Sequence, residues 1–393
     1  MKIGSAALAA FLTFGATAAS AADLDTVRTA LTPLRQSTTD PASRMPREFL
    51  TVRDSLRDWI ETRLAGFPQF GDAAAFAKTL NAEIAAKDLA CIDGKEPGYN
   101  RCASPRELDA RGFLGLVEVA RVQDLLIVQA ETGIPCGFDE TAYVYEWVND
   151  GWRRLVDTSQ AAAGGPYLAE QIEQVLFVQP DGMPRDALLL AVTGATPSCA
   201  DQYRPVHYRV WSAKRGTGSS LVVDGREGDA DVARRSPAVS ARFEDGDLLL
   251  EMDLRSFDPS RRSRVAVRRF NFDKPQAARV APLALSPRDF VEEWLRSSWS
   301  AAATWTSPAA RGALAPVHAS AHQNLSRARF SGATLRCAGD SAVQVGVRFA
   351  DGERFFRVKH DPAGAYVMLA ADSAPADTCA RPDASLDSPR TLF

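Results

Sequence analysis

The sequence of 393 residues lacks the short motifs that mark common catalytic and nucleotide-binding sites. It contains no G-x-S-x-G, no G-x-G-x-x-G and no G-x-x-x-x-G-K-[ST]. These are the patterns of nucleophile elbows, dinucleotide-binding turns and phosphate-binding loops. Histidine, a common general base, occurs only 4 times. We therefore expect no cofactor, and the sequence indicates no particular reaction.

Lysine is also scarce, since only 7 of the 46 basic residues are lysines. The formal net charge is −3, whereas a nucleic-acid-binding protein normally carries a basic surface. The composition therefore excludes nucleic acid as the expected partner. The excess of arginine fits either genomic base composition or the use of arginine forks to bind carboxylates and phosphates.

Long hydrophobic runs are confined to the N-terminus. A short positive region precedes an apolar stretch at residues 3–14, and the small residues 19–21 follow. This order is typical of a signal peptide, which we assign to residues 1–22 with cleavage near Ala21 or Ala22. No cysteine lies there for lipid attachment, and no later run is long enough to span a membrane. We expect a periplasmic or secreted protein without a transmembrane segment.

A sequence pattern of about 60 residues, typical of a small β-sheet unit, occurs three times in the middle of the chain. Its second strand is apolar each time, and aligning Leu126, Leu189 and Leu250 gives spacings of 63 and 61 residues. Within each copy, alternating side chains and turn residues predict four antiparallel strands. A fixed period is typical of repeat architectures such as β-propeller blades, although three blades are too few to close a propeller. The alternative is an open stack or a large sandwich of meanders.

We therefore predict a mainly β protein in three parts after the signal peptide. A helical N-terminal region covers residues 23–111, where apolar residues recur every three to four positions. Residues 112–285 form a β-repeat domain of three four-stranded antiparallel meanders. Residues 286–393 form a small α+β domain that opens with a helix-start pattern of Ser, Pro and an acid. Its last strands are alternatively a fourth, displaced repeat.

Six cysteines, an even number, favour disulfides in an exported protein. They are Cys91, Cys102, Cys136, Cys199, Cys337 and Cys379. The repeat places the third and fourth in equivalent loops of neighbouring units, so we expect a bridge between them. The first two can close a short loop, which leaves the last two to pair with each other. Metal binding is the alternative, but no C-x-x-C pair is present.

The strongest local concentration of charge is an arginine run in the third repeat. Arg261, Arg262 and Arg264 are followed by Arg268 and Arg269. The first two lie in the loop that corresponds to the cysteine-containing loops of the other repeats, so we expect them on the same face. Arginine forks there can clamp a carboxylate, phosphate or sulfate group. We predict Arg261, Arg262 and Arg264 as ligand-binding residues, with charged protection of an edge strand as the alternative.

Two further groups have weaker support as metal sites. His318 and His322 lie four residues apart on a predicted helix, but no third ligand is indicated. Asp224, Glu227, Asp229 and Asp231 are close in sequence, but their spacing does not match an EF-hand loop. We predict no metal and interpret both groups as polar surface.

These observations favour a non-enzymatic, exported binding or scaffold protein that uses the loop face of the β-repeat domain. The expected partner is an anionic small molecule, an envelope component or another protein. The alternative is an envelope hydrolase whose site assembles between repeats or at the junction with the C-terminal domain. That alternative stands because acids and bases distant in sequence can meet in a fold.

Overall fold

The computed structural model describes most of the chain between residues 23 and 387. The described ranges are 23–34, 47–90, 112–134, 137–159, 169–179, 186–197, 203–231, 237–273, 277–280, 284–339, 341–360 and 365–387. The predicted signal peptide and four of the six cysteines lie outside these ranges.

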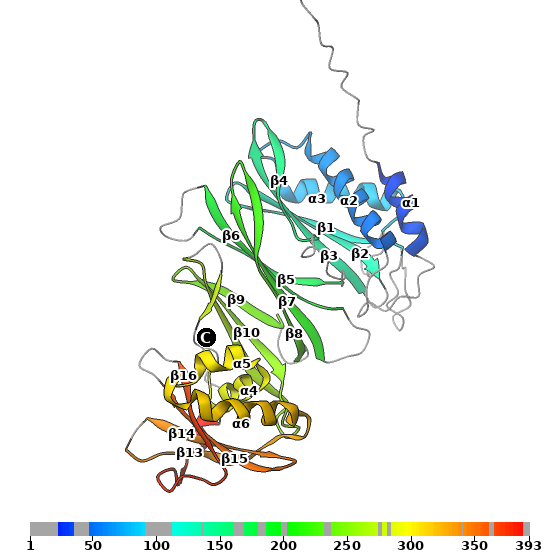
Figure 1. Cartoon of the computed structure of the whole chain (residues 1–393). Helices are drawn as coiled ribbons and strands as arrows, with labels where there is room; N and C mark the ends of the chain where they lie inside the picture. Colours follow the sequence, from blue (N-terminus) through cyan, green and yellow to red (C-terminus); the bar gives the residue numbers. More distant parts are fainter. Residues whose placement is uncertain are drawn as a thin grey trace, which may run out of the picture.

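Three helices lie at the N-terminal end of the molecule, as the apolar spacing predicts (Figure 1). They are α1 (Leu24–Leu34), α2 (Arg47–Leu64) and α3 (Ala73–Ala86). Asp72 caps α3, because its carboxylate accepts a hydrogen bond from the backbone N–H of Ala74 at 2.9 Å. The apolar stripes of the helices, including the fully buried Trp59, pack on one face of the first sheet.

The first predicted meander is a four-stranded antiparallel sheet of its own. Its strands pair in chain order and are β1 (Leu114–Val122), β2 (Leu125–Ile134), β3 (Gly137–Val148) and β4 (Gly151–Asp157). On one face, Leu126, Val128 and Tyr143 join the core formed with the helices. On the other face, Leu125 and Val144 pack against the second meander. Both faces are thus buried by the alternation of side chains along the strands.

The second and third meanders share one eight-stranded sheet, a connection that the sequence did not predict. Their strands are β5 (Gln171–Val178), β6 (Ala187–Ala195), β7 (Tyr203–Lys214), β8 (Gly218–Asp231), β9 (Val239–Glu244), β10 (Asp247–Arg255), β11 (Ser263–Asn271) and β12 (Ala278–Val280). The strand order is β12-β11-β10-β8-β7-β6-β5, and β9 also pairs with β10. Among the described residues, the strand pairing that joins the two meanders into one sheet is the pair Ala230 with Leu254, at the end of the long strand β8.

This shared sheet bends round its own core, because apolar residues of both meanders belong to one buried cluster. At the rim, side chains of β5 reach the backbone of β9. Glu173 accepts a hydrogen bond from the N–H of Val239 at 3.2 Å, and Gln174 accepts one from Ala241 at 2.9 Å. These contacts satisfy backbone donors of β9 that a further strand could otherwise use.

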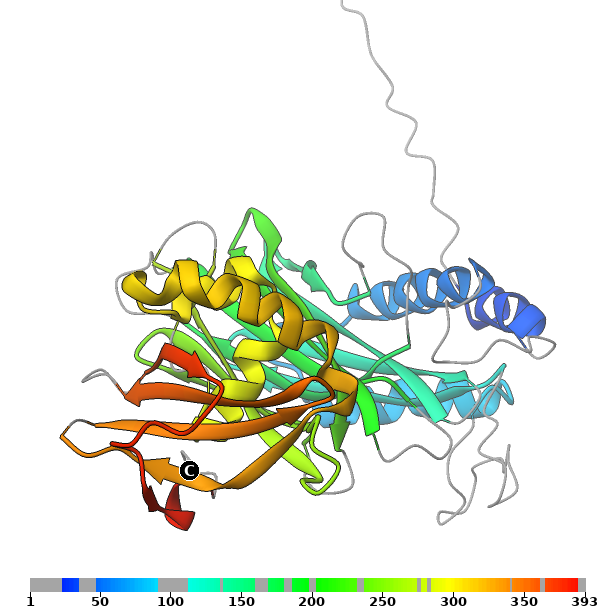
Figure 2. The same cartoon turned by 60° about the horizontal axis from the view of Figure 1, so that its bottom comes forward.

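The C-terminal residues form their own helices and sheet (Figure 2). The elements are α4 (Pro287–Arg296), α5 (Trp299–Ala302), α6 (Arg311–Gln323), β13 (Arg329–Arg336), β14 (Ala342–Phe349), β15 (Gly352–His360), β16 (Tyr366–Asp372) and β17 (Arg381–Pro382), with 3-10 turns at Ala303–Trp305, Pro308–Ala310, Leu325–Arg327 and Ala384–Leu386. The strand order β16-β15-β14-β13-β17 makes a sheet separate from the repeats. Helix α4 begins as predicted, since Ser286 accepts a hydrogen bond from the N–H of Asp289. Phe290 and Trp294 of this helix belong to the core that also contains the new sheet.

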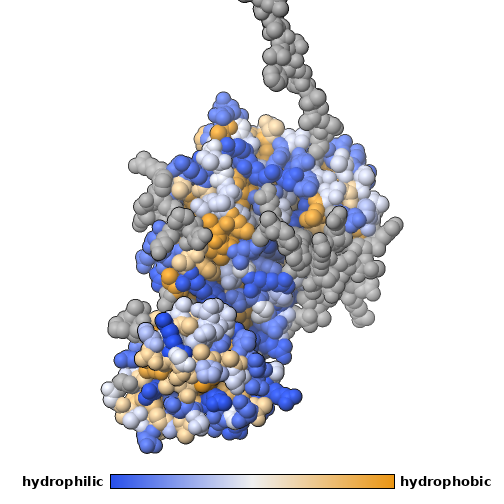
Figure 3. All heavy atoms as spheres, in the orientation of Figure 1, coloured by the Kyte–Doolittle hydropathy of each residue, from blue (hydrophilic) through white to orange (hydrophobic). Residues whose placement is uncertain are grey.

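The surface is mostly hydrophilic over the first meanders on the face drawn in Figure 3, with an apolar area near β6. The C-terminal region shows a more mixed surface in the same view. Among the described residues, the exposed large apolar side chains are Leu50 and Phe70. Within those same ranges, no helix is long and apolar enough to cross a membrane.

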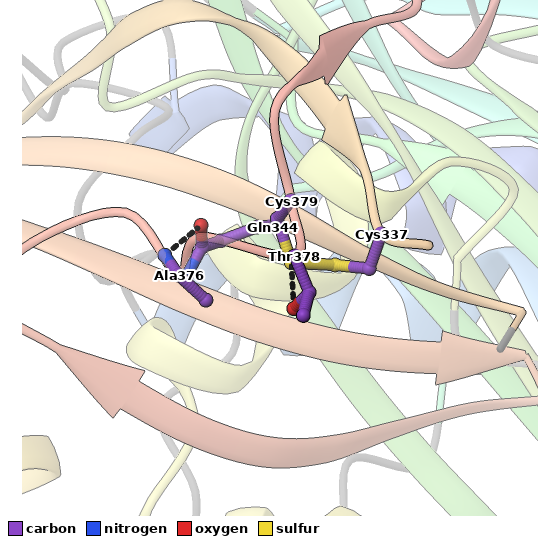
Figure 4. The surroundings of a disulfide bond; sticks show 5 residues. All are labelled: Cys337, Gln344, Ala376, Thr378 and Cys379. Carbon is purple, nitrogen blue, oxygen red and sulfur yellow. Dashed lines mark hydrogen bonds between the residues drawn. A yellow bond between two sulfur atoms is a disulfide. The ribbon is translucent and has the colours of Figure 1, made fainter. Parts of the chain in front are cut away.

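Cys337 and Cys379 form a disulfide, as the sequence predicted (Figure 4). Beside it, the backbone N–H of Ala376 donates to the side chain of Gln344 at 3.1 Å. The bond joins the end of β13 to the segment that follows β16, 42 residues later. The other two predicted bridges lie outside the described residues.

Replacing both cysteines of this bridge by serine should destabilise the C-terminal region. Closing a loop of this length lowers the conformational entropy of the unfolded chain, which raises the free energy of unfolding by about 4 kcal/mol in the chain-entropy model. Urea unfolding followed by tryptophan fluorescence, with and without reductant for the wild type, measures the difference. A double variant as stable as the oxidised wild type would contradict the expected effect.

Candidate functional site

The predicted ligand-binding arginines lie where the β10–β11 loop meets helix α4. A guanidinium nitrogen of Arg261 lies 2.7 Å from a carboxylate oxygen of the fully buried Asp289. Nε of Arg262 lies 2.8 Å from Asp231, and this arginine keeps 55% of its side chain exposed. Both positive charges therefore already have partners within the chain.

Arg264 and Arg268 reach deeper into the same junction. Arg264 lies 2.8 Å from Glu293 and 3.5 Å from Glu292. Arg268 and Arg279 also contact Glu293, at 3.1 and 2.9 Å. Burial alone would raise the pKa of Glu293, but the three arginines hold it well below its usual range. The junction is therefore an ionised network enclosed by protein.

This network gives the arginine run a role in joining two parts of the chain. The nearby acids also take part, because Glu227 pairs with Arg268 at 2.6 Å and Asp231 pairs with Arg262. A ligand anion would have to displace a carboxylate of the chain to reach Arg261 or Arg262. Anion binding by the three predicted residues stays a prediction.

The two histidines make contacts with backbone oxygens. His318 Nε2 lies 3.0 Å from the carbonyl oxygen of Trp294, and His322 Nδ1 lies 2.8 Å from that of Leu295. These contacts attach α6 to the last turns of α4. In the part of the chain that the structure describes, no three His, Cys, Asp or Glu side chains are placed to hold a metal ion.

A cleft of about 350 Å³ lies between helix α2 and the β3–β4 hairpin. Its lining residues are Glu61, Leu64, Tyr145, Trp152, Arg153 and Arg154. The first two come from the last turn of α2, the tyrosine from β3, and the other three from consecutive positions of β4.

Two ion pairs frame this cleft. Arg154 Nη1 lies 2.6 Å from Glu61 Oε1, and both side chains are partly exposed. Arg153 pairs with Glu146, whose carboxylate also accepts a hydrogen bond from the backbone N–H of Gly216 at 3.0 Å. Because Gly216 belongs to the β7–β8 turn, the second pair ties the cleft to the shared sheet.

The aromatic residues of the cleft are held firmly. The indole N–H of Trp152 donates to the carbonyl oxygen of Phe67 at 2.9 Å, and Trp147 packs edge-on at 5.3 Å between ring centres. The hydroxyl group of Tyr145 is buried and has no hydrogen-bond partner among the residues that the structure describes. Burial and the nearby Glu61 raise the pKa of Tyr145 well above its ordinary value, so it remains a neutral donor.

The sequence does not reveal this cleft, because its lining residues belong to elements that are far apart in the chain. The alternating aromatic residues of β3 were a signal for a buried face, which the structure confirms for Tyr143 and Tyr145. Nothing in the sequence indicates that Glu61 of α2 would meet Arg154, 93 residues later. An unusual density of aromatic and arginine residues around the β3–β4 turn was the available clue.

Comparisons with known proteins identify no family, because no family model and no curated protein matches the chain. Among solved structures, an α-L-arabinofuranosidase from Fusarium graminearum overlaps 71% of this chain and 69% of its own, with 12% identity and a TM-score of 0.28. An α-L-arabinanase from Penicillium chrysogenum overlaps 72% and 66%, with 12% identity and a TM-score of 0.25. A β-fructofuranosidase from Bombyx mori overlaps 64% and 49%, with 8% identity and a TM-score of 0.24. TM-scores this low carry no argument about the activity of this chain.

Replacing Glu293 by Gln should break the network at α4, since it leaves buried arginines without a counter-charge. We expect the free energy of unfolding to fall by about 3–5 kcal/mol. Arg348→Ala is the matched control, because its exposed ion pair with Glu353 should contribute less than about 1 kcal/mol. Urea denaturation monitored by circular dichroism compares the variants. Equal stability losses in the two would refute the special role of Glu293.

Proposed function

We propose that this protein binds a small polar molecule with several hydroxyl groups in the cleft between α2 and the β3–β4 hairpin. The observation that carries the proposal is the buried hydroxyl of Tyr145, a residue that lines the cleft, because this hydroxyl has no hydrogen-bond partner in the described part of the chain. A buried polar group without a partner costs about 1–3 kcal/mol, so such groups usually have a specific reason. A ligand hydroxyl that completes the hydrogen bond would supply one.

The Glu61–Arg154 pair is where the ligand would gain access to this hydroxyl. The two charged groups are respectively 37% and 29% exposed, and such pairs contribute about 1 kcal/mol or less. Opening the pair therefore costs less than a ligand regains from new hydrogen bonds. Once separated, the carboxylate accepts and the guanidinium donates hydrogen bonds, which suits a molecule that carries alternating hydroxyl groups.

The chemistry of the lining favours binding over hydrolysis. Among the described residues that line the cleft, Glu61 is the single carboxylate, whereas glycoside hydrolysis usually employs two. The same lining contains no serine, cysteine or histidine as nucleophile or base. The proposal keeps the binding role expected from the sequence but moves its site from the arginine loop to the cleft.

Titration calorimetry with neutral sugars, sugar acids and polyols tests the proposal. A member of the panel should bind the wild type, and Tyr145→Phe should weaken that binding about tenfold, the loss of one hydrogen bond. The stability of this variant should be equal or slightly higher, because the deleted hydroxyl has no partner.

Tyr143→Phe is the matched control for this titration, since Tyr143 is a buried neighbour on the same strand face but does not line the cleft. It should leave binding unchanged. Failure of the whole panel to bind, or equal weakening by both substitutions, would overturn the proposed function.

We also propose that the protein is exported to a periplasm or secreted. The disulfide between Cys337 and Cys379 supports this location, since such bonds persist in oxidising compartments. N-terminal sequencing of protein purified from its native source should find a chain that starts near residue 22 or 23. An intact N-terminus at Met1 would contradict export by a cleaved signal peptide.

A further inference from the structure

Two glutamates face each other on the first sheet, away from the cleft. Glu131 of β2 is paired directly with Glu140 of β3 in the strand register. Ala130, one residue before Glu131, and Tyr143, three residues after Glu140, belong to the core under the helices. Because side chains alternate along a strand, the two glutamates lie on the opposite face, towards the shared sheet. Side chains directly opposite on one face are close enough to interact, and like charges there are unfavourable.

Glu131 lies in a space that a glycine leaves open. Its Oε2 accepts a hydrogen bond from the backbone N–H of Leu116 at 2.9 Å. A Cβ atom at Gly115 would overlap the same oxygen, so any other residue there would push the carboxyl group out. The position of this acid is therefore fixed by the backbone of β1.

Glu140 joins the first sheet to the shared sheet. Its Oε2 accepts hydrogen bonds from Gln129 Nε2 at 2.8 Å and from the backbone N–H of Ile172, on β5, at 2.9 Å. Its own backbone N–H donates to the carbonyl oxygen of Glu170 at 2.7 Å. The β3–β5 junction is defined here by these contacts between Glu140 and residues 170–172.

The charged groups that the structure describes around the pair do not neutralise it. Glu118 on β1 adds a negative charge near Glu131, and Asp139 adds one near Glu140. The arginines on the neighbouring elements are engaged elsewhere, because Arg53 lies 3.7 Å from Asp139 and Arg209 lies 2.5 Å from Glu170.

Burial and mutual repulsion therefore favour the protonated state. Burial is the main cause that raises the pKa of Glu140 to about 7, and the charge of Glu131 adds to it. The hydrogen bonds from Ile172 and Gln129 favour ionisation but do not outweigh these effects. Burial also raises the pKa of Glu131.

We propose that Glu140 keeps a proton near neutral pH beside the charge of Glu131, and that the loss of this proton loosens the β3–β5 junction between the first sheet and the shared sheet. In this step the proton passes to solvent, and Glu131 and Glu140 are then both carboxylates. The direction in which stability changes with pH follows from the raised pKa of Glu140. The stabilising contribution is complete below its ordinary value of 4.5 and is lost as the pH rises through about 7.

The opposite end of β3 offers a built-in comparison. Glu146 also connects β3 to the shared sheet, through the backbone N–H of Gly216, but it has Arg153 as a counter-charge. One strand thus carries two carboxylate contacts to the same neighbour, one with a cation and one without. We expect the pH response at the Glu140 end alone.

Hydrogen–deuterium exchange of the mature protein at pH 5.5 and pH 8, corrected for intrinsic rates, tests the proposal. In the wild type, the segment that contains the N–H of Ile172 should exchange at least about tenfold faster at the higher pH. In Glu140→Gln, which resembles the protonated acid, the segment should stay protected at both values. Glu146→Gln is the matched control and should keep the wild-type response of this segment.

Glu131→Gln provides a second variant that removes the like charge and leaves Glu140 in place. The midpoint of the pH response should move down by about one pH unit, because the negative charge of Glu131 no longer raises the pKa of Glu140. A wild type without any pH response at β5 would overturn the proposal. So would a response that persists unchanged in both Glu140→Gln and Glu131→Gln.

Discussion

The structure depends on one constraint, which is that the meanders are apolar on both faces. Strand β6 is buried along nearly its whole length, and β2 contributes Leu125 to one core and Leu126 to another. A sheet of this kind is stable only when something covers each side. The layers follow from this need: helices, first meander, shared sheet. At the far end, buried acids of α4 contact arginines of the third meander, whereas the apolar residues of α4 belong to the core of the C-terminal sheet.

Several of the polar contacts at the layer boundaries are made by glutamates. Glu140 and Glu146 connect the first sheet to the shared sheet, and Glu173 connects β5 to β9. Glu293 connects α4 to the arginines of β11 and its surroundings. A carboxylate can accept several hydrogen bonds at once, so it suits places where backbone donors of two sheets converge. Apolar packing supplies most of the burial, and these acids fix how the layers align.

The strands and the helix starts could be predicted from the sequence, because both rest on local patterns. The period that relates Leu126, Leu189 and Leu250 placed each on the second strand of its meander. The union of the second and third meanders could not be foreseen, since the described strand pairing that joins them, Ala230 of β8 with Leu254 of β10, follows no repeat pattern. The partners of the arginine run and the members of the cleft were also hidden. Their contacts join residues far apart in the chain, which no periodicity encodes.

The order in which the chain is made gives the α4 junction a consequence for folding. The arginines of β11 leave the ribosome before the acids of α4, because synthesis runs from the N-terminus. Until Glu292 and Glu293 arrive, Arg264 lacks these two carboxylate partners, and Arg268 has Glu227 but not Glu293. The third meander therefore cannot reach its final packing on its own. Its completion waits for a helix encoded more than twenty residues later.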